Sequence, residues 1–156
     1  MAKIQKITPH LWYDKQAVEA AKFYVSIFPK SKIKNIAQLR NTPSGDCDVV
    51  VFDLCGQEFM AISAGPYFKF NEAISLVVHC DTQKEIDYYW EKLSAVPESE
   101  QCGWLKDKFG LSWQIVPSAF GKLAGGDPAR SQRMFAAMQQ MNKLDMQKLQ
   151  QAYDGN

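Results

Sequence analysis

Residues 102–117, CGWLKDKFGLSWQIVP, predict a hairpin whose second arm is a strand that ends at Pro117. Side chains alternate between the two faces of a strand, so Ser112, Gln114 and Val116 share one face, and the bulkier apolar residues of this arm share the other. Gln114 is therefore a lone amide in an otherwise apolar arm. The fold that this hairpin belongs to should explain what the amide faces.

The segment before this hairpin predicts a strand followed by a helix. AISLVVHC (73–80) is a short apolar run of the kind that forms a buried strand. Thr82 and Glu85 have the spacing of a capping box, and an apolar stripe at helical spacing runs from there to Pro97, which ends the helix. Further strands are expected near 99–106 and 111–116.

The first half of the chain follows the same plan. A strand is expected over 4–13, and Asp14 can cap a helix over 15–28 that Pro29 stops. Glycines at two turn signals then separate three strands. These strands are expected at about 33–40, 48–55 and 58–64, with turns at 42–46 and 55–58.

The order βαβββ thus occurs twice, and we interpret the chain as a duplicated α+β fold, with one α+β domain of unrelated halves as the alternative. Methionines and leucines recur at helical spacing after Pro117 and predict a helical extension that covers the domain or a partner subunit. The predicted organisation is one domain over 1–156, with a first module (4–65), a second module (73–117) and a helical tail (118–156).

Composition and charge exclude several classes of function. The 156 residues are 46% apolar, which is enough for a real core, and 18 basic residues balance 17 acidic ones to leave a net charge of +1. Such a chain has no long-range field to attract nucleic acid or an anionic membrane, and no apolar run approaches the roughly 20 residues that span a bilayer. Four cysteines without a C-x-x-C pair, and no signal peptide, indicate reduced thiols and a cytoplasmic location.

Five stretches together cover nearly the whole chain and are specific: LWYDKQAVEAAKFYVSIFPKS (11–31), GPYFKFNEAISLVVHCD (65–81), YWEKLS (89–94), CGWLKDKFGLSWQIVP (102–117) and AAMQQMNKLDMQKL (136–149). In these stretches the chain resembles the PhnB-like branch of the vicinal oxygen chelate superfamily, the glyoxalase and bleomycin-resistance group. Within that branch it is similar to the family labelled 3-demethylubiquinone-9 3-methyltransferase. The resemblance implies paired βαβββ modules whose sheets curl around a cavity, in a homodimer.

In metal-dependent members of the superfamily, histidines and carboxylates of both modules hold a divalent ion in the cavity. The resemblance puts Gln114 at the carboxylate position of the second module and Ser75 at its histidine position. In the first module His10 resembles a ligand, but the expected last strand, FMAISA (59–64), has no carboxylate. An amide and a hydroxyl bring neither charge nor imidazole, so we expect no metal and no other cofactor.

Alternation predicts which residues face this cavity, and His10, with a reference pKa of about 6.5, is the best candidate for a general base. His79 we interpret as structural, and Gln114 could instead only satisfy a neighbouring backbone group. The predicted ligand-binding residues are Thr8, His10, Trp12, Ser75, Val77, Ser112 and Gln114.

Three functions fit these residues: binding of a small organic molecule in a metal-free cavity, an enzyme that uses the same cavity, and a methyltransferase as the family label suggests. The first is favoured, because the sequence lacks the Gly-rich turn with which a doubly wound enzyme would bind S-adenosylmethionine. Whether catalysis occurs is left open by the residues. The expected partners are a small-molecule ligand and a second copy of the chain.

Overall fold

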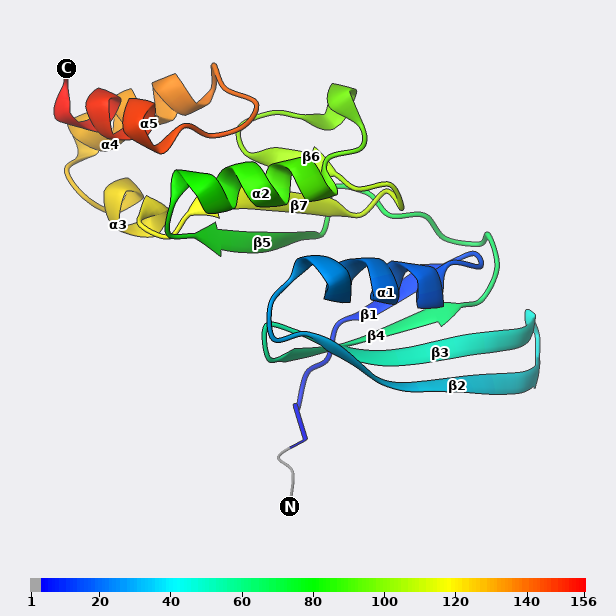
Figure 1. The fold of residues 1–156 in the computed structure, drawn as a ribbon. Helices are drawn as coiled ribbons and strands as arrows, with labels where there is room; N and C mark the ends of the chain where they lie inside the picture. Colours follow the sequence, from blue (N-terminus) through cyan, green and yellow to red (C-terminus); the bar gives the residue numbers. More distant parts are fainter. Residues whose placement is uncertain (1–3) are drawn as a thin grey trace. The chain divides into compact units, whose positions relative to one another are not determined.

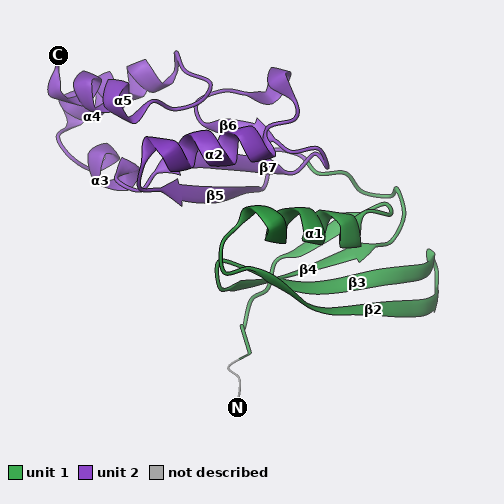
Figure 2. Cartoon of the chain, in the orientation of Figure 1, with its two compact units in different colours: residues 1–70 green, residues 71–156 purple. Residues whose placement is uncertain are grey.

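The computed structural model describes residues 4–156, which form two compact units. The first unit ends at Phe70 and the second begins at Asn71, as Figure 2 shows by colour. Each unit has its own sheet and its own covering helix, and each is described below by itself.

The first unit is a four-stranded sheet with one helix. The strands lie in the order β1-β4-β3-β2, with β1 parallel to β4 and the other neighbours antiparallel. This is the βαβββ module that the sequence predicts. Its elements are β1 (His10–Tyr13), α1 (Ala17–Ile27), β2 (Lys32–Thr42), β3 (Gly45–Leu54) and β4 (Gln57–Ser63).

Helix α1 lies across one face of this sheet (Figure 1) and buries its apolar stripe there. Small side chains such as Ala20 and Ala21 are fully buried, so the helix backbone can approach the sheet closely. Tyr24 stacks on Phe52 of β3, with ring centroids 6.5 Å apart. The expected cap was wrong: Asp14 does not cap α1.

The first free amide of α1 is instead satisfied from the sheet. The backbone N–H of Ala17 donates a 3.0 Å hydrogen bond to Oγ of Ser63, at the end of β4. Ser63, which is 46 positions away in the sequence, thus replaces a local N-cap. The spacing of residues in the sequence does not indicate such a long-range contact.

The second unit is a three-stranded sheet with a helical tail. The strand order is β5-β7-β6, with β5 parallel and β6 antiparallel to β7. Its elements are β5 (Ser75–Cys80), α2 (Gln83–Leu93), the 3-10 helix η1 (Pro97–Ser99), β6 (Trp104–Lys106), β7 (Ser112–Pro117), α3 (Phe120–Ala124), α4 (Pro128–Met138) and α5 (Met146–Asp154).

The mixed α+β class is confirmed, and the capping box of α2 is present: Oγ1 of Thr82 accepts from the backbone N–H of Glu85, whose carboxylate accepts from the backbone N–H of Thr82. The second sheet, however, has one strand fewer than the predicted βαβββ plan. The strand expected near 99–106 is shorter, because Cys102 and Gly103 adopt positive φ angles of 52° and 85° and turn the chain back on itself.

The tail packs on the second unit. Met134, Leu144 and Leu149 form a buried cluster with Val116 at the end of β7. The turn before β6 is tied to the same tail, because the backbone N–H of Gly103 donates to the carbonyl of Asn142 at 2.8 Å. The methionine-rich helices therefore cover their own domain, which is one of the two alternatives that the sequence left open. Within residues 4–156 no helix has the length and apolar character needed to cross a membrane.

Candidate functional site

The face of the second sheet opposite α2 carries most of the polar groups that the sequence analysis singled out. Ser75 pairs with Ser112 across β5 and β7, and Val77 pairs with Gln114. Residues that pair directly across two strands point to the same face. Four of the predicted ligand-binding residues therefore share one surface of the second unit.

Gln114 is hydrogen-bonded to another side chain on this face. Its Nε2 donates to Oγ of Ser75 at 2.9 Å, and the pair is partly buried. This contact answers what the lone amide faces: the hydroxyl of the neighbouring strand, not a backbone group. The two positions that the resemblance assigns to metal ligands thus bind each other.

Ser112 stands out because its hydroxyl has no partner. The residue is 0% exposed, and its Oγ is buried without a hydrogen bond in the described part of the chain. A buried hydroxyl left unsatisfied costs about 1–3 kcal/mol. An unsatisfied buried hydroxyl in a folded protein needs an explanation, and one explanation is a ligand that hydrogen-bonds to it.

A cavity of about 500 Å³ has Ser112 among its lining residues, all of which belong to the second unit. Ser112 contributes to its wall together with Trp104 and Lys106 of β6. Trp104 pairs with Gln114, and Lys106 pairs with Ser112, so both belong to the open face of the sheet. A cavity of this size is in the usual range for small-molecule sites.

The cavity also contains charge. Nζ of Lys106 forms an ion pair with the carboxylate of Glu72, and this lysine holds the pKa of Glu72 below its ordinary value. Trp104 and Lys106 are not among the predicted site residues, although the register of the hairpin places them beside Gln114 and Ser112. Glu72 could not have been found in this way, since it precedes β5 and belongs to no strand.

The predicted residues of the first module, Thr8, His10 and Trp12, all lie in the first unit. His10 is exposed, and Trp12 shares its strand face. Nε1 of Trp12 donates to the carbonyl of Gly65 at 2.9 Å, and its ring meets Phe68 edge to face at 4.9 Å. Trp12 thus anchors the segment that follows β4. Thr8 lies before the first strand, because β1 begins at His10 and not near residue 4 as expected.

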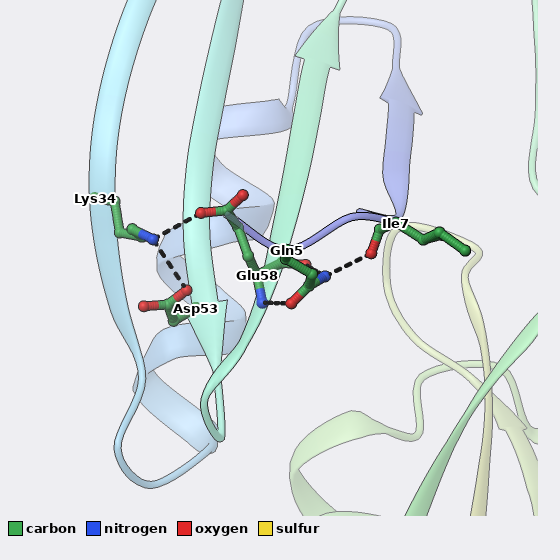
Figure 3. Close-up of polar contacts among 5 residues, drawn as sticks. All are labelled: Gln5, Ile7, Lys34, Asp53 and Glu58. Carbon is green, nitrogen blue, oxygen red and sulfur yellow. Dashed lines mark hydrogen bonds and ion pairs between the residues drawn. The ribbon is translucent and has the colours of Figure 1, made fainter. Parts of the chain in front are cut away.

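In place of the expected strand, the side chain of Gln5 holds the N-terminal segment on β4. Its amide accepts from the backbone N–H of Glu58 at 3.0 Å and donates to the carbonyls of Glu58 and Ile7 (Figure 3). β4 (Gln57–Ser63) is shifted by one residue from the predicted 58–64, and Glu58 gives it a carboxylate that the stretch 59–64 lacks. The carboxylate of Glu58 is engaged by Lys34, whose Nζ lies 2.6 Å from Oε2 and 3.7 Å from a carboxylate oxygen of Asp53.

The residues present do not suit the superfamily metal. In the described residues 4–156, no group of three or more His, Cys, Asp or Glu side chains has the arrangement of a metal site. At the two second-module positions, the amide of Gln114 and the hydroxyl of Ser75 are joined to each other. Their donor set is neutral and lacks the thiolate, imidazole and carboxylate ligands that divalent transition metals prefer.

Two of the four cysteines, Cys80 and Cys55, are poor candidates for a nucleophile. Cys80 is 0% exposed, and burial, with a smaller effect of Glu85 and Asp81, raises the pKa of its thiol to about 12. Cys55 is exposed, and partial burial of its thiol also raises its pKa. Cys102 lines the cavity but adopts the left-handed backbone of a turn. A thiol with a raised pKa carries little of the reactive thiolate near neutral pH.

These units, each a small sheet with one covering helix, define an α+β protein of the glyoxalase type. The chain belongs to the 3-demethylubiquinone-9 3-methyltransferase family, whose sequence profile matches residues 5–116. It is 38% identical to a putative 3-demethylubiquinone-9 3-methyltransferase, the PhnB protein from Bacillus cereus, over 72% of this chain and 99% of that one, with a TM-score of 0.61.

A second solved structure shows the same fold at low identity. The protein PA1353 from Pseudomonas aeruginosa is 17% identical over 73% of this chain and 98% of its own, with a TM-score of 0.56. This likeness supports the fold alone. Among curated proteins, none matches the chain significantly.

Proposed function

We propose that the chain binds a small organic molecule on the open face of the second sheet, in a metal-free cavity, and that it does so in the cytoplasm. The observation that carries this proposal is Ser112, whose buried hydroxyl has no partner and which is among the residues that line a cavity of about 500 Å³. Trp104 supplies an apolar wall and Lys106 a cation, so the cavity offers both contact area and polar recognition. A ligand that hydrogen-bonds to Ser112 removes the cost of its isolation.

Two buried serines provide the test. Ser112→Ala should stabilise the free protein by about 1 kcal/mol, because it removes an unsatisfied hydroxyl. Ser131→Ala is the matched control: Ser131 is 5% exposed, but its Oγ donates to the carbonyl of Leu123 at 2.7 Å. It should destabilise the protein by about as much. Opposite changes in melting temperature support the proposal, and a destabilised Ser112→Ala variant contradicts its premise.

Ligand binding is then measured by a thermal-shift screen of metabolites on the wild type and on Ser112→Ala. A molecule that binds only the native state must raise its stability. We expect at least one compound to stabilise the wild type and to lose most of that effect in the variant. If every stabilising compound raises the melting temperature of both proteins equally, Ser112 does not contribute to ligand binding.

The family name implies methyl transfer, but the local sequence argues against a doubly wound cofactor site. The connection from β1 to α1 (Asp14–Gln16) and that from β5 to α2 (Asp81–Thr82) contain no glycine. A backbone that approaches S-adenosylmethionine closely in that kind of fold needs glycine there. We expect no saturable heat in a calorimetric titration with S-adenosylmethionine at tens of micromolar, roughly the affinity range of cofactor binding.

We also propose that the protein is a homodimer. Val77, on the open face of the second sheet, is 47% exposed, and open sheet faces and edges are surfaces that a two-fold partner can bury. Light scattering at micromolar concentration should give twice the 17.7 kDa mass of the chain. A monomeric mass at that concentration would contradict the dimer and leave the binding proposal unaffected.

A further inference from the structure

We propose that the ligand of this cavity carries a carboxylate, and that the carboxylate replaces Glu72 on Lys106. This inference rests on the proposed binding function and names the class of molecule that the site would take. It follows from the placement of three residues that line the same cavity: Ser112, Lys106 and Glu72.

Lys106 and Ser112 form a two-point recognition element. They pair directly across β6 and β7, so their side chains leave the same face of the sheet side by side. The lysine can bind one oxygen of a carboxylate, and the unpartnered hydroxyl of Ser112 can donate to the other. A neutral ligand would use the hydroxyl and leave the lysine to Glu72.

Glu72 forms an ion pair with Lys106 that a ligand carboxylate could replace. The Lys106 side chain is 23% exposed, whereas that of Glu72 is 62% exposed, so the cation lies in the wall and its carboxylate partner lies toward solvent. The ion pair with Lys106 lowers the pKa of Glu72 and so favours its charged form. Exposed ion pairs contribute little to stability, so the exchange of one carboxylate for another is cheap.

The surrounding charges favour a monoanion with an apolar body. Glu98 lines the cavity together with Glu72, and two acidic side chains in one cavity oppose a doubly charged phosphate. Trp104 in the same wall offers an apolar surface for the rest of the molecule. Aryl carboxylates combine these features.

The test compares acids with their amides on the full chain. The probes are benzoate, phenylacetate and naphthalene-2-carboxylate, each with its primary amide, titrated at neutral pH and low salt. We expect Glu72→Gln to bind the acids about tenfold more tightly than the wild type does, because the competing carboxylate is gone. Glu91→Gln is the matched control: it removes the same charge from an exposed position on α2 outside the cavity lining, and it should change acid affinity by less than about twofold. Lys106→Met should abolish the preference for acid over amide.

Each outcome decides the inference. It is overturned if acids and amides bind the wild type equally, if the affinity of Glu72→Gln stays within about twofold of the wild type, or if no acid binds Glu72→Gln. The Glu72→Gln arm is decisive even if Lys106→Met does not fold. Amides that bind in a Ser112-dependent way would overturn the carboxylate and keep the proposed function. A metabolite screen that finds no compound whose stabilising effect depends on Ser112 would overturn the proposed function itself.

Discussion

Nε1 of Trp113 donates a 2.8 Å hydrogen bond to Oδ2 of Asp107, and both residues are buried. The other oxygen of the same carboxylate accepts from the backbone N–H groups of Phe109 and Leu111, at 2.8 and 3.1 Å. Asp107 thus closes the turn between β6 and β7 and fixes the indole in the core. Asp107 lies in the turn of the hairpin, and its bond to Trp113 depends on the burial of both side chains.

Asp107→Ala should lower the free energy of unfolding by about 3 kcal/mol, because it leaves buried donors without an acceptor. Asp107→Asn should cost about 2 kcal/mol, since an amide can still accept from the backbone but turns an N–H group toward Trp113 or loses a backbone partner. Urea denaturation measures both. An Asn variant as stable as the wild type would show that the indole bond contributes nothing.

The turn before β6 offers a second prediction, with a built-in control. Gly56 and Gly103 both have φ of 85°, but a Cβ on Gly56 would meet nothing within 4 Å. A Cβ on Gly103 would lie 3.0 Å from Leu144 and 3.1 Å from the carbonyl oxygen of Ile115. Gly56→Ala should therefore cost about 1 kcal/mol, for the backbone alone.

Gly103→Ala should cost at least about twice as much, because the added methyl also separates the turn from the tail. The difference between the two variants in urea denaturation reports how tightly the tail docks on the second unit. Equal losses would mean that Leu144 moves aside freely and that the docking of the tail is loose.

These two glycines also show how far sequence reasoning reached. The dipeptide Cys-Gly at 55–56 was recognised as a turn, since it falls between two clear strands. The same dipeptide at 102–103 was placed inside a strand, although it adopts the same pair of positive φ angles. Its turn is tied to Asn142, and contacts about 40 residues away leave no local pattern.

The candidate site was also predictable only in part, because the sequence shows which residues share a strand face but not which contacts they make in the fold. The resemblance brought Ser75 and Gln114 together, and the structure joins them by a hydrogen bond. Alternation gave the face of Ser112 but could not show that its hydroxyl lacks a partner, because that depends on everything packed around it. Glu72 was missed because an irregular segment carries no periodicity from which a direction can be inferred.

Cys80 yields a prediction on reactivity and pH. At pH 8 a thiol of pKa about 12 is ionised in roughly one molecule in ten thousand, so folded Cys80 should resist iodoacetamide while exposed Cys55 is alkylated. Mass spectrometry of the labelled peptides checks this, and in urea both should react.

In the unfolded chain the thiol ionises near its ordinary value of 9.0, so the stability that Cys80 contributes is intact below that pH and is lost between 9.0 and about 12. Cys80→Ala should flatten this loss, and rapid labelling of native Cys80 would contradict its burial.

The last prediction concerns the metal that the fold family suggests. To bind an ion, Gln114 and Ser75 would have to break their 2.9 Å hydrogen bond and offer neutral oxygens, and in the described chain no group of three His, Cys, Asp or Glu residues is arranged to add charged ligands. Zinc, nickel, manganese and iron gain most of their affinity from thiolate, imidazole and carboxylate donors. Elemental analysis of the dialysed protein should therefore find far less than one such ion per chain, and none of these ions, added at micromolar concentration, should raise the melting temperature. About one ion per chain, removed by a chelator with a matching loss of stability, would contradict the neutral site and return these two residues to the role of ligands.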